Sequence, residues 1–248
     1  TLPGISCKFG MSLGEDVTVA GLMKEYKAAF LAPGLWAGRR LDVPGMEGAA
    51  VTDALEFLVE SRNNGGDPVK DRVLVIGGGS VASDVAIMAQ NRGAKSVSIA
   101  CLEGAEEMPC LPSEVDEMKL KGIAFHNGWG PKEVVSASKM RFVECTGVLD
   151  DQGRFAPSFD ESRKMDLDFD QVILAVGQAV ESGLAGYLEE EFQTDGLLEV
   201  EQETLQVKGR PGLYAGGDIV RGAGTIVEAV ADGRRAARAM DNAIRGRK

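Results

Sequence analysis

The chain has little histidine and cysteine for its length, which narrows the chemistry it can carry. Its 248 residues include one histidine, His126, so a histidine-based triad or a multi-histidine metal site cannot be built. We expect His126 to be an ordinary strand or loop residue. The four cysteines, Cys7, Cys101, Cys110 and Cys145, form no C-x-x-C pair and no cluster-ligand spacing. The sequence therefore predicts no metal site, no iron–sulfur cluster in this chain and no dithiol disulfide reductase.

Positive charge and long apolar runs are also scarce. The chain has 27 lysines and arginines against 38 acidic residues, a formal net charge of −11. Nucleic acids and anionic membranes require a basic surface, so neither is expected as a partner. No apolar run approaches the roughly 18 to 20 residues of a membrane span, and no signal peptide opens the chain. We therefore expect a globular cytoplasmic protein.

The most informative feature that is present is a glycine-rich turn between a predicted strand and a predicted helix. Residues 73–76 are apolar and mostly β-branched, which is typical of a buried parallel strand. In a dinucleotide-binding turn, Gly77 would make the sharp bend, and Gly79 would let the main chain approach a pyrophosphate. Ala82 is small enough for the helix to pack closely on the strand. The pattern predicts nucleotide binding, with a purely structural turn as the alternative.

The helix after this turn is expected to begin near Ser80 and to direct its free N–H groups at the phosphates. Ser80 can cap the helix. No Gly-Lys-Ser/Thr follows the glycines, so the turn is not a P-loop. The candidate pyrophosphate-binding residues are Gly77, Gly78, Gly79, Ser80 and Val81.

A candidate ribose-binding carboxylate follows the next strand. Residues 95–100 are predicted to form that strand, and Glu103 comes just after it. In this fold a carboxylate at that position accepts hydrogen bonds from the adenosine ribose of NAD. Glu103 is therefore the candidate for that role.

The C-terminal region carries a second site signal. A short strand ends in Gly216-Gly217-Asp218, where a carboxylate can meet ribityl or ribose hydroxyls, and a helix beginning at Thr225 would point its N-terminus at a flavin. The candidate flavin-binding residues are Gly217, Asp218, Thr225, Ile226 and Val227. The alternative is a turn and an amphipathic helix. Its core-facing residues would be Ile226, Val230, Ala237, Met240 and Ile244.

The remaining pattern predicts the order of elements. We expect helices over 18–26 and 52–61, and a linker at 63–68 that opens a domain. Strands are expected over 4–9, 27–34, 122–126 and 171–178, with a small antiparallel hairpin arm over 139–145 and 154–159.

Several stretches together resemble one family. The chain is similar to the flavin- and pyridine-nucleotide-binding portion of the glutamate synthase small-subunit family, whose relatives include dihydropyrimidine dehydrogenase and electron-bifurcating ferredoxin:NADP oxidoreductases. The matching stretches are 32–36, 43–45, 77–84, 106–109, 129–131, 173–178 and 214–233.

The resemblance implies a fold and a function. The fold is α/β, with a doubly wound parallel-sheet NAD(P)-binding domain (66–175) inserted into a partial FAD-type domain (1–65 and 176–248), as in thioredoxin reductase. The implied function is an oxidoreductase module that passes hydride between NADH and FAD, with Gly177 and Gln178 lining the nicotinamide side. Hydride transfer needs no side-chain acid or base, so no catalytic residue is assigned.

Two departures from the family qualify this picture. The family's cluster-binding region and first FAD-gripping turn do not occur here, so we expect the parent protein, and not this piece alone, to hold FAD and to pass electrons to an iron–sulfur domain or subunit. Where NADPH-using relatives carry an arginine pair, this chain has Leu102-Glu103. Two like charges ~4 Å apart cost roughly 1 to 4 kcal/mol, so NADH should be favoured over NADPH by about tenfold. Lys95, the nearest basic residue, stands at the start of the strand 95–100 and should lie at the wrong end of it.

Three alternatives stay open at this point. The chain could be an NADPH-dependent glutamate synthase small subunit, or a non-enzymatic nucleotide-binding and interaction module. Glu106 and Glu107 could have a role or form only a solvated acidic turn. The final electron acceptor is not indicated by the sequence.

Overall fold

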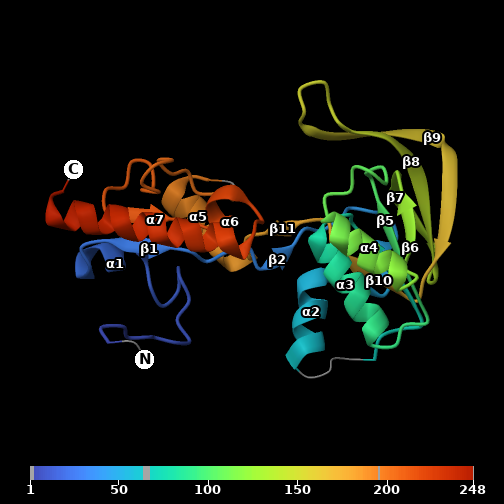
Figure 1. Ribbon diagram of the computed structural model, residues 1–248, viewed down its shortest axis with the longest axis horizontal. Helices are drawn as coiled ribbons and strands as arrows, with labels where there is room; N and C mark the ends of the chain where they lie inside the picture. Colours follow the sequence, from blue (N-terminus) through green and yellow to red (C-terminus); the bar gives the residue numbers. More distant parts are fainter. Residues whose placement is uncertain (1–2, 64–67, 195, 248) are drawn as a thin grey trace. The chain divides into compact units, whose positions relative to one another are not determined.

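The chain folds into two compact units (Figure 1). The computed structural model describes residues 3–63, 68–194 and 196–247. Unit 1 comprises residues 1–37 and 178–248, and unit 2 comprises residues 38–177. The central part of the chain is thus inserted into a unit made of both ends.

Unit 2 is built on a parallel sheet of five strands in the order β3-β10-β4-β5-β6. Their bounds are β3 (Val51–Asp53), β10 (Gln171–Leu174), β4 (Arg72–Ile76), β5 (Ser96–Cys101) and β6 (Ala124–Asn127). The central strands are apolar on both faces, as expected for strands covered on both sides. The predicted strands at 73–76, 95–100, 122–126 and 171–178 are thereby confirmed within a few residues.

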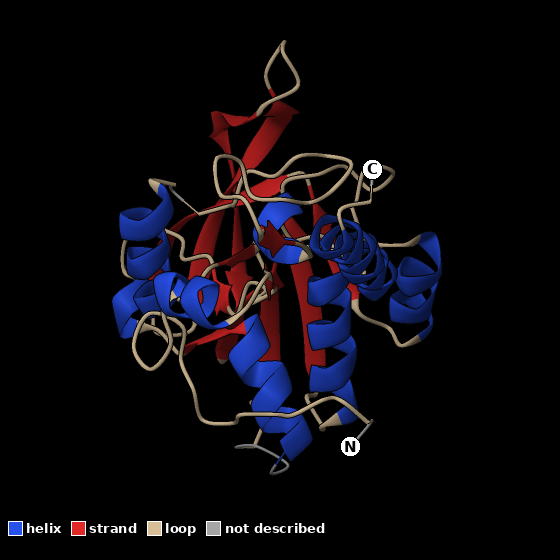
Figure 2. Cartoon of the chain, turned by 90° about the vertical axis from the view of Figure 1, so that its left-hand side faces the viewer, coloured by secondary structure: helices blue, strands red, loops and turns tan. Residues whose placement is uncertain are grey.

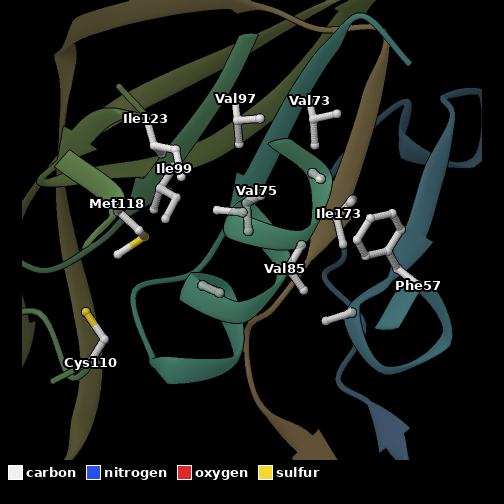
Figure 3. Packing of buried hydrophobic residues seen from close by; sticks show 14 residues of the cluster. Phe57, Val73, Val75, Val85, Val97, Ile99, Cys110, Met118, Ile123 and Ile173 are labelled. Atoms are coloured by element: carbon white, nitrogen blue, oxygen red, sulfur yellow. The ribbon is translucent and has the colours of Figure 1, made fainter. Parts of the chain in front are cut away.

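Three helices cover one face of this sheet: α2 (Ala54–Asn63), α3 (Ser80–Asn91) and α4 (Pro112–Leu120). Figure 3 shows the packing, in which Val75 and Ile99 of the sheet lie against Val85 of α3 and Met118 of α4. All four side chains are fully buried. Burial of each such side chain stabilises the unit by roughly 1.5 to 3 kcal/mol.

The opposite face is covered by a three-stranded antiparallel sheet: β7 (Trp129–Ser136), β8 (Lys139–Leu149) and β9 (Phe155–Asp168). Met140 and Phe142 of β8 pack on Leu74 and Val172 of the parallel sheet. The α/β fold class is confirmed, and this sheet occupies the face that helices cover in other doubly wound domains. The expected small hairpin arm is larger than predicted. The turn between β8 and β9 projects from it in both views (Figures 1 and 2).

The first domain boundary differs from the one predicted. We expected residues 1–65 to belong to the first segment, yet 38–65 lie in unit 2. The reason is that Val51–Asp53 adds to the edge of the parallel sheet beside β10, and Met46 of the short 3-10 helix η1 (Met46–Gly48) packs on the same core. The second boundary, at 177/178, lies two residues from the expected one.

Unit 1 contains a two-stranded parallel sheet, β1 (Ala29–Leu31) and β12 (Leu213–Ala215). Its helices are α1 (Val19–Glu25), α5 (Ser182–Phe192), α6 (Asp218–Arg221) and α7 (Ile226–Arg245). Leu31 and Leu213 of the sheet form a core with Leu188 of α5 and Ile219 of α6. The strands β2 (Ala37–Gly38) and β11 (Gln178–Ala179) pair where the chain passes from one unit to the other.

Several local predictions need correction. Residues 4–9 form no strand: they are exposed, and no described segment pairs with them. The helix expected over 52–61 begins at Ala54, since Asp53 ends β3 and accepts the Leu55 amide at 2.9 Å. The helix over 18–26 is confirmed as α1. Of the predicted linker at 63–68, residues 64–67 lie outside the described residues.

Most of the apolar residues of α7 that were expected to face a core are exposed instead. Ile226, Val230 and Ile244 are exposed, whereas Ala236 is buried and Met240 packs beside it. No helix in the described part of the chain is long and apolar enough to cross a membrane.

Candidate functional site

The glycine turn lies at the carboxyl end of β4, next to the end of β10. These two strands are neighbours although their paired residues, such as Leu74 and Val172, lie 98 positions apart in the sequence. β10 joins the sheet beside β4 only after β5 and β6 have been added on the other side. The chain leaves β4 toward β5 on one side, and β10 inserts on the other. Ligands of open α/β sheets bind in the crevice at such a reversal of strand order.

Gly77 makes the bend that the sequence predicts. Its φ is +132°, a conformation that disfavours any side chain, and an added Cβ would clash with the Ala175 carbonyl oxygen. The Gly77 amide donates to the Ala100 oxygen of β5 at 2.9 Å. Gly77 is thus fixed by both neighbouring strands, and only glycine fits there.

Gly79 differs from Gly77 because the space above it is open. Nothing lies within 4 Å of a Cβ built at Gly79, and its φ of −85° is ordinary. Gly79 is the N-cap of α3, and its carbonyl accepts the amides of Ala82 and Ser83. The amides of Ser80 and Val81 have no acceptor among the described residues, so the turn offers two free donors to an anion.

Ser80 does not cap α3 as expected. Gly79 occupies the cap position, and the Ser80 hydroxyl donates to Glu114 Oε2 at 2.8 Å. The same oxygen accepts the Leu111 amide at 2.9 Å at the start of α4. The sequence did not indicate Glu114 as a site residue, although its place after Leu111-Pro112 is typical of a helix start.

Glu103 lies beside the turn. Its Oε2 is 3.1 Å from a Cβ built at Gly78, and its main-chain oxygen accepts the Gly128 amide at 3.0 Å. No basic side chain pairs with the Glu103 carboxylate within the described ranges. Lys95 pairs instead with Asp71 at 2.6 Å, at the opposite end of β5. The carboxylate is therefore available to accept hydroxyl donors.

Two buried thiols border the same turn. Cys101 lies against Gly78, and its sulfur accepts a hydrogen bond from the side-chain amide Nδ2 of Asn127 at 3.2 Å. The Cys110 main-chain N–H donates to the Gly78 oxygen. Burial, followed by the nearby Glu103 carboxylate, raises the pKa of Cys101 to about 12. Burial raises the pKa of Cys110 as well. All four described cysteines are free thiols.

The expected nicotinamide-side residues follow β10. Gly177 has a φ of +110°, and its oxygen accepts the Arg39 amide at 3.0 Å. Gln178 begins β11. Gly177 shares unit 2 with Gly77–Val81 and Glu103, whereas Gln178 belongs to unit 1.

The second group of candidates lies in unit 1, at the end of β12. Gly216 and Gly217 are buried, and an added Cβ at Gly216 would meet Phe30 and Asp232 at 2.9 Å each. Asp218 is half-buried, and its Oδ1 accepts the Gly224 amide at 3.2 Å. The two glycines are thus packed against the interior of unit 1, and Asp218 is the first residue of the turn that is partly exposed.

The N-terminus of α7 is capped more fully than expected. The Thr225 hydroxyl accepts the Glu228 amide at 3.3 Å, and Glu228 accepts the Thr225 amide at 2.8 Å. The Thr225 amide is therefore already used. The amides of Ile226 and Val227 have no acceptor among the described residues, and both side chains are exposed.

A buried carboxylate that the sequence did not reveal supports this turn. Asp232 of α7 is completely buried, and its Oδ2 accepts the Gly217 amide at 2.9 Å. Arg221 of α6 donates to both Asp232 oxygens, and Arg235 lies 3.2 Å from one of them. The Gly-Gly-Asp turn, α6 and α7 are thus joined through one side chain.

A model of the family described as pyridine nucleotide-disulphide oxidoreductase matches residues 10–233. The chain belongs to this family. Over 98% of its length it is 34% identical to the NADP(+)-dependent formate dehydrogenase subunit beta of Moorella thermoacetica, of which it covers 35%. Over 96% of its length it is 32% identical to a putative glutamate synthase [NADPH] small chain of Cereibacter sphaeroides, of which it covers 61%. The chain thus spans about a third to three fifths of these relatives.

Solved structures agree on the fold. FprA from Mycobacterium tuberculosis superposes with a TM-score of 0.74 at 18% identity, covering 95% of this chain and 68% of its own. Thioredoxin reductase from T. acidophilum gives 0.60 at 19% identity, covering 88% of this chain and 66% of its own. The resemblance to the glutamate synthase small-subunit family and the thioredoxin-reductase-like fold are both confirmed.

Proposed function

We propose that unit 2 binds a nicotinamide dinucleotide and that the chain forms part of an oxidoreductase in which hydride passes between nicotinamide and flavin. The observation that carries this proposal is the turn at Gly77–Gly79, open above Gly79 and flanked by the unpaired Glu103 carboxylate. The turn lies at the reversal of strand order, where this class of sheet binds ligands.

Each part of the turn has a distinct task in binding. The free amides of Ser80 and Val81 and the positive end of α3 would hold the pyrophosphate. Gly79 leaves the room that the phosphates need, and Glu103 would accept the ribose hydroxyls. Gly177 and Gln178 would line the nicotinamide side. These residues bind and orient, and none must exchange a proton.

Flavin is assigned to the Gly-Gly-Asp turn of unit 1 in the whole protein. The Asp218 carboxylate can accept ribityl or ribose hydroxyls, and the free amides of Ile226 and Val227 can stabilise negative charge on a flavin. A bound flavin supplies the two-electron acceptor for the nicotinamide hydride. Gly217 has a φ of +73°, which favours glycine, and its amide donates to Asp232, so the turn that presents Asp218 is held in place.

We infer that NADH is preferred over NADPH. A 2′-phosphate on the ribose would face the negatively charged Glu103 carboxylate. Lys95 cannot offset this repulsion, because it pairs with Asp71 at the other end of β5. The names of the relatives include NADP(+)- and NADPH-dependent proteins as well as an NAD-dependent one, so the inference rests on Glu103 alone. An iron–sulfur partner and a cytoplasmic location remain predictions from the sequence.

The test is a calorimetric titration of the protein with NADH and with NADPH. We expect NADH to bind about tenfold more tightly, and Glu103→Gln to narrow the difference, since neutralising the carboxylate removes the repulsion of the 2′-phosphate. Glu106→Gln, at an exposed acidic residue nearby, is the matched control and should change neither affinity. Equal or tighter NADPH binding contradicts the preference, and no heat with either coenzyme contradicts nucleotide binding.

A further inference from the structure

One surface of unit 1 is basic although the chain as a whole is strongly acidic. A hollow of about 890 Å³ lies between α7 and the segment 203–206. Its lining includes four arginines, Arg234, Arg235, Arg238 and Arg247, and a single carboxylate, Glu203. Such a concentration of guanidinium groups is unexpected in a chain of net charge −11.

Two of these arginines have no counter-charge. Arg235 pairs with Asp232, and Arg247 lies 3.7 Å from Asp241. Arg234 and Arg238 pair with no carboxylate among the described residues. They stand four positions apart on α7, where two like charges are neighbours and destabilise the helix. An anionic partner would offset that repulsion.

The hollow also contains neutral polar side chains. Tyr214 lines it, although the residue as a whole is only 2% exposed. Gln206 and Asn242 supply further neutral donors around it.

We propose that this hollow binds an extended acidic segment of a partner protein. The spacing of the two arginines indicates which kind of ligand fits the hollow. Arg234 and Arg238 lie about 5 to 6 Å apart on one helix face, and alternate side chains of an extended chain lie about 7 Å apart on one face. The α7 residues of the lining run from Ala231 to Ala243, about 18 Å of helix, which is too long for one small phosphate group.

The partner segment therefore carries an acidic residue at every second position. Two successive acidic side chains pair with Arg234 and Arg238, one with each. Glu203 at the rim would repel an acidic side chain and so limits the register in which the segment can lie. Two of the similar proteins are named as subunits or chains of larger enzymes, consistent with a protein partner.

The experiment measures fluorescence anisotropy of a labelled peptide of alternating glutamate and serine with the full 248-residue chain at low salt. We expect binding that is lost in about 1 M NaCl, where charge interactions are screened. The double variant R234E/R238E should weaken it at least about tenfold. The control variant K24E/K27E changes the net charge of the same unit by the same amount, at two exposed lysines in and just after α1. Its affinity for the peptide should stay within about twofold of the unmodified protein's.

Three results would overturn the proposal. They are equal weakening in R234E/R238E and K24E/K27E, equal binding of a glutamine–serine peptide, and displacement by pyrophosphate as effective as by unlabelled peptide, which would indicate a small-anion site. Circular dichroism of both variants verifies that α7 is intact.

Discussion

The hydroxyl of Ser80, the first residue of α3, donates its hydrogen bond to Oε2 of Glu114, 2.8 Å away at the start of α4. This contact places a carboxylate next to the amides that would hold a pyrophosphate. The negative charge of Glu114 opposes the bound phosphates, whereas the α3 dipole favours them. If the turn binds a pyrophosphate as we propose, it should bind it less tightly than its backbone alone would allow.

Replacing Glu114 by glutamine should strengthen dinucleotide binding. Glutamine keeps an oxygen for the Leu111 amide, so α4 stays capped, while the repulsion of phosphate is removed. We expect an affinity gain of about two- to fivefold, corresponding to roughly 0.5 to 1 kcal/mol. Calorimetry with NADH measures it. Glu117→Gln in the same helix is the control, and an equal gain there would show a general charge effect.

Gly79→Ala should abolish binding while preserving the fold. A methyl group at Gly79 meets nothing within 4 Å, and the backbone conformation there suits alanine. The added methyl would occupy the space proposed for the pyrophosphate, so NADH affinity should fall at least about tenfold, a loss of ~1.4 kcal/mol or more. Gly48→Ala, also in unit 2 with no atom within 4 Å, should bind normally. Unchanged affinity in Gly79→Ala would place the coenzyme elsewhere.

Asp232→Asn should destabilise unit 1. The substitution retains an acceptor for the Gly217 amide but leaves Arg221 and Arg235 without their shared carboxylate. Asp232 is buried, but Arg221 and Arg235 are 33% and 44% exposed and Arg221 keeps Glu228 at 3.8 Å, so we expect a cost of about 1.5 to 3 kcal/mol. Asp241→Asn breaks the exposed pair with Arg245 and should cost less than about 1 kcal/mol. Urea unfolding measures both. Equal costs would mean that Asp232 is not the link between α6 and α7.

Cys101 should be the slowest thiol to react in the native protein. Burial raises its pKa to about 12, so at pH 8 it is almost wholly protonated and shielded, whereas Cys7 is exposed. A thiol-specific chromogenic reagent should label Cys7 first, and Cys7→Ser should remove that fast phase. Because Cys145 is half-buried, the decisive variant is C7S/C145S: a fast phase that persists there would show that Cys101 or Cys110 is accessible.

The same shift predicts a dependence of stability on pH. In the unfolded chain, Cys101 loses its proton around pH 9, the ordinary thiol pKa, whereas in the native state its pKa is about 12. The unfolded state therefore binds fewer protons, and the free energy of unfolding should decrease as the pH rises from about 9 to 12. Cys101→Ala should reduce that decrease. An identical pH profile in the variant would contradict the assignment.

The glycine turn was predictable because each of its determinants is local. A strand, three glycines and a helix follow one another directly, and Gly77 needs its conformation whatever surrounds it. The three-residue strand Val51–Asp53 was not predictable in this way. It exists because β10, more than a hundred residues later, supplies its hydrogen-bond partners.

The contacts of the candidate site divide in the same manner. Residue types and spacing alone indicated Gly77, Gly79 and Glu103, since a bend, an open approach and a carboxylate after the next strand are properties of the chain itself. Only the tertiary structure joined Ser80 to Glu114 and Asp232 to Gly217, because packing of helices decides which distant polar groups must satisfy one another once water is excluded.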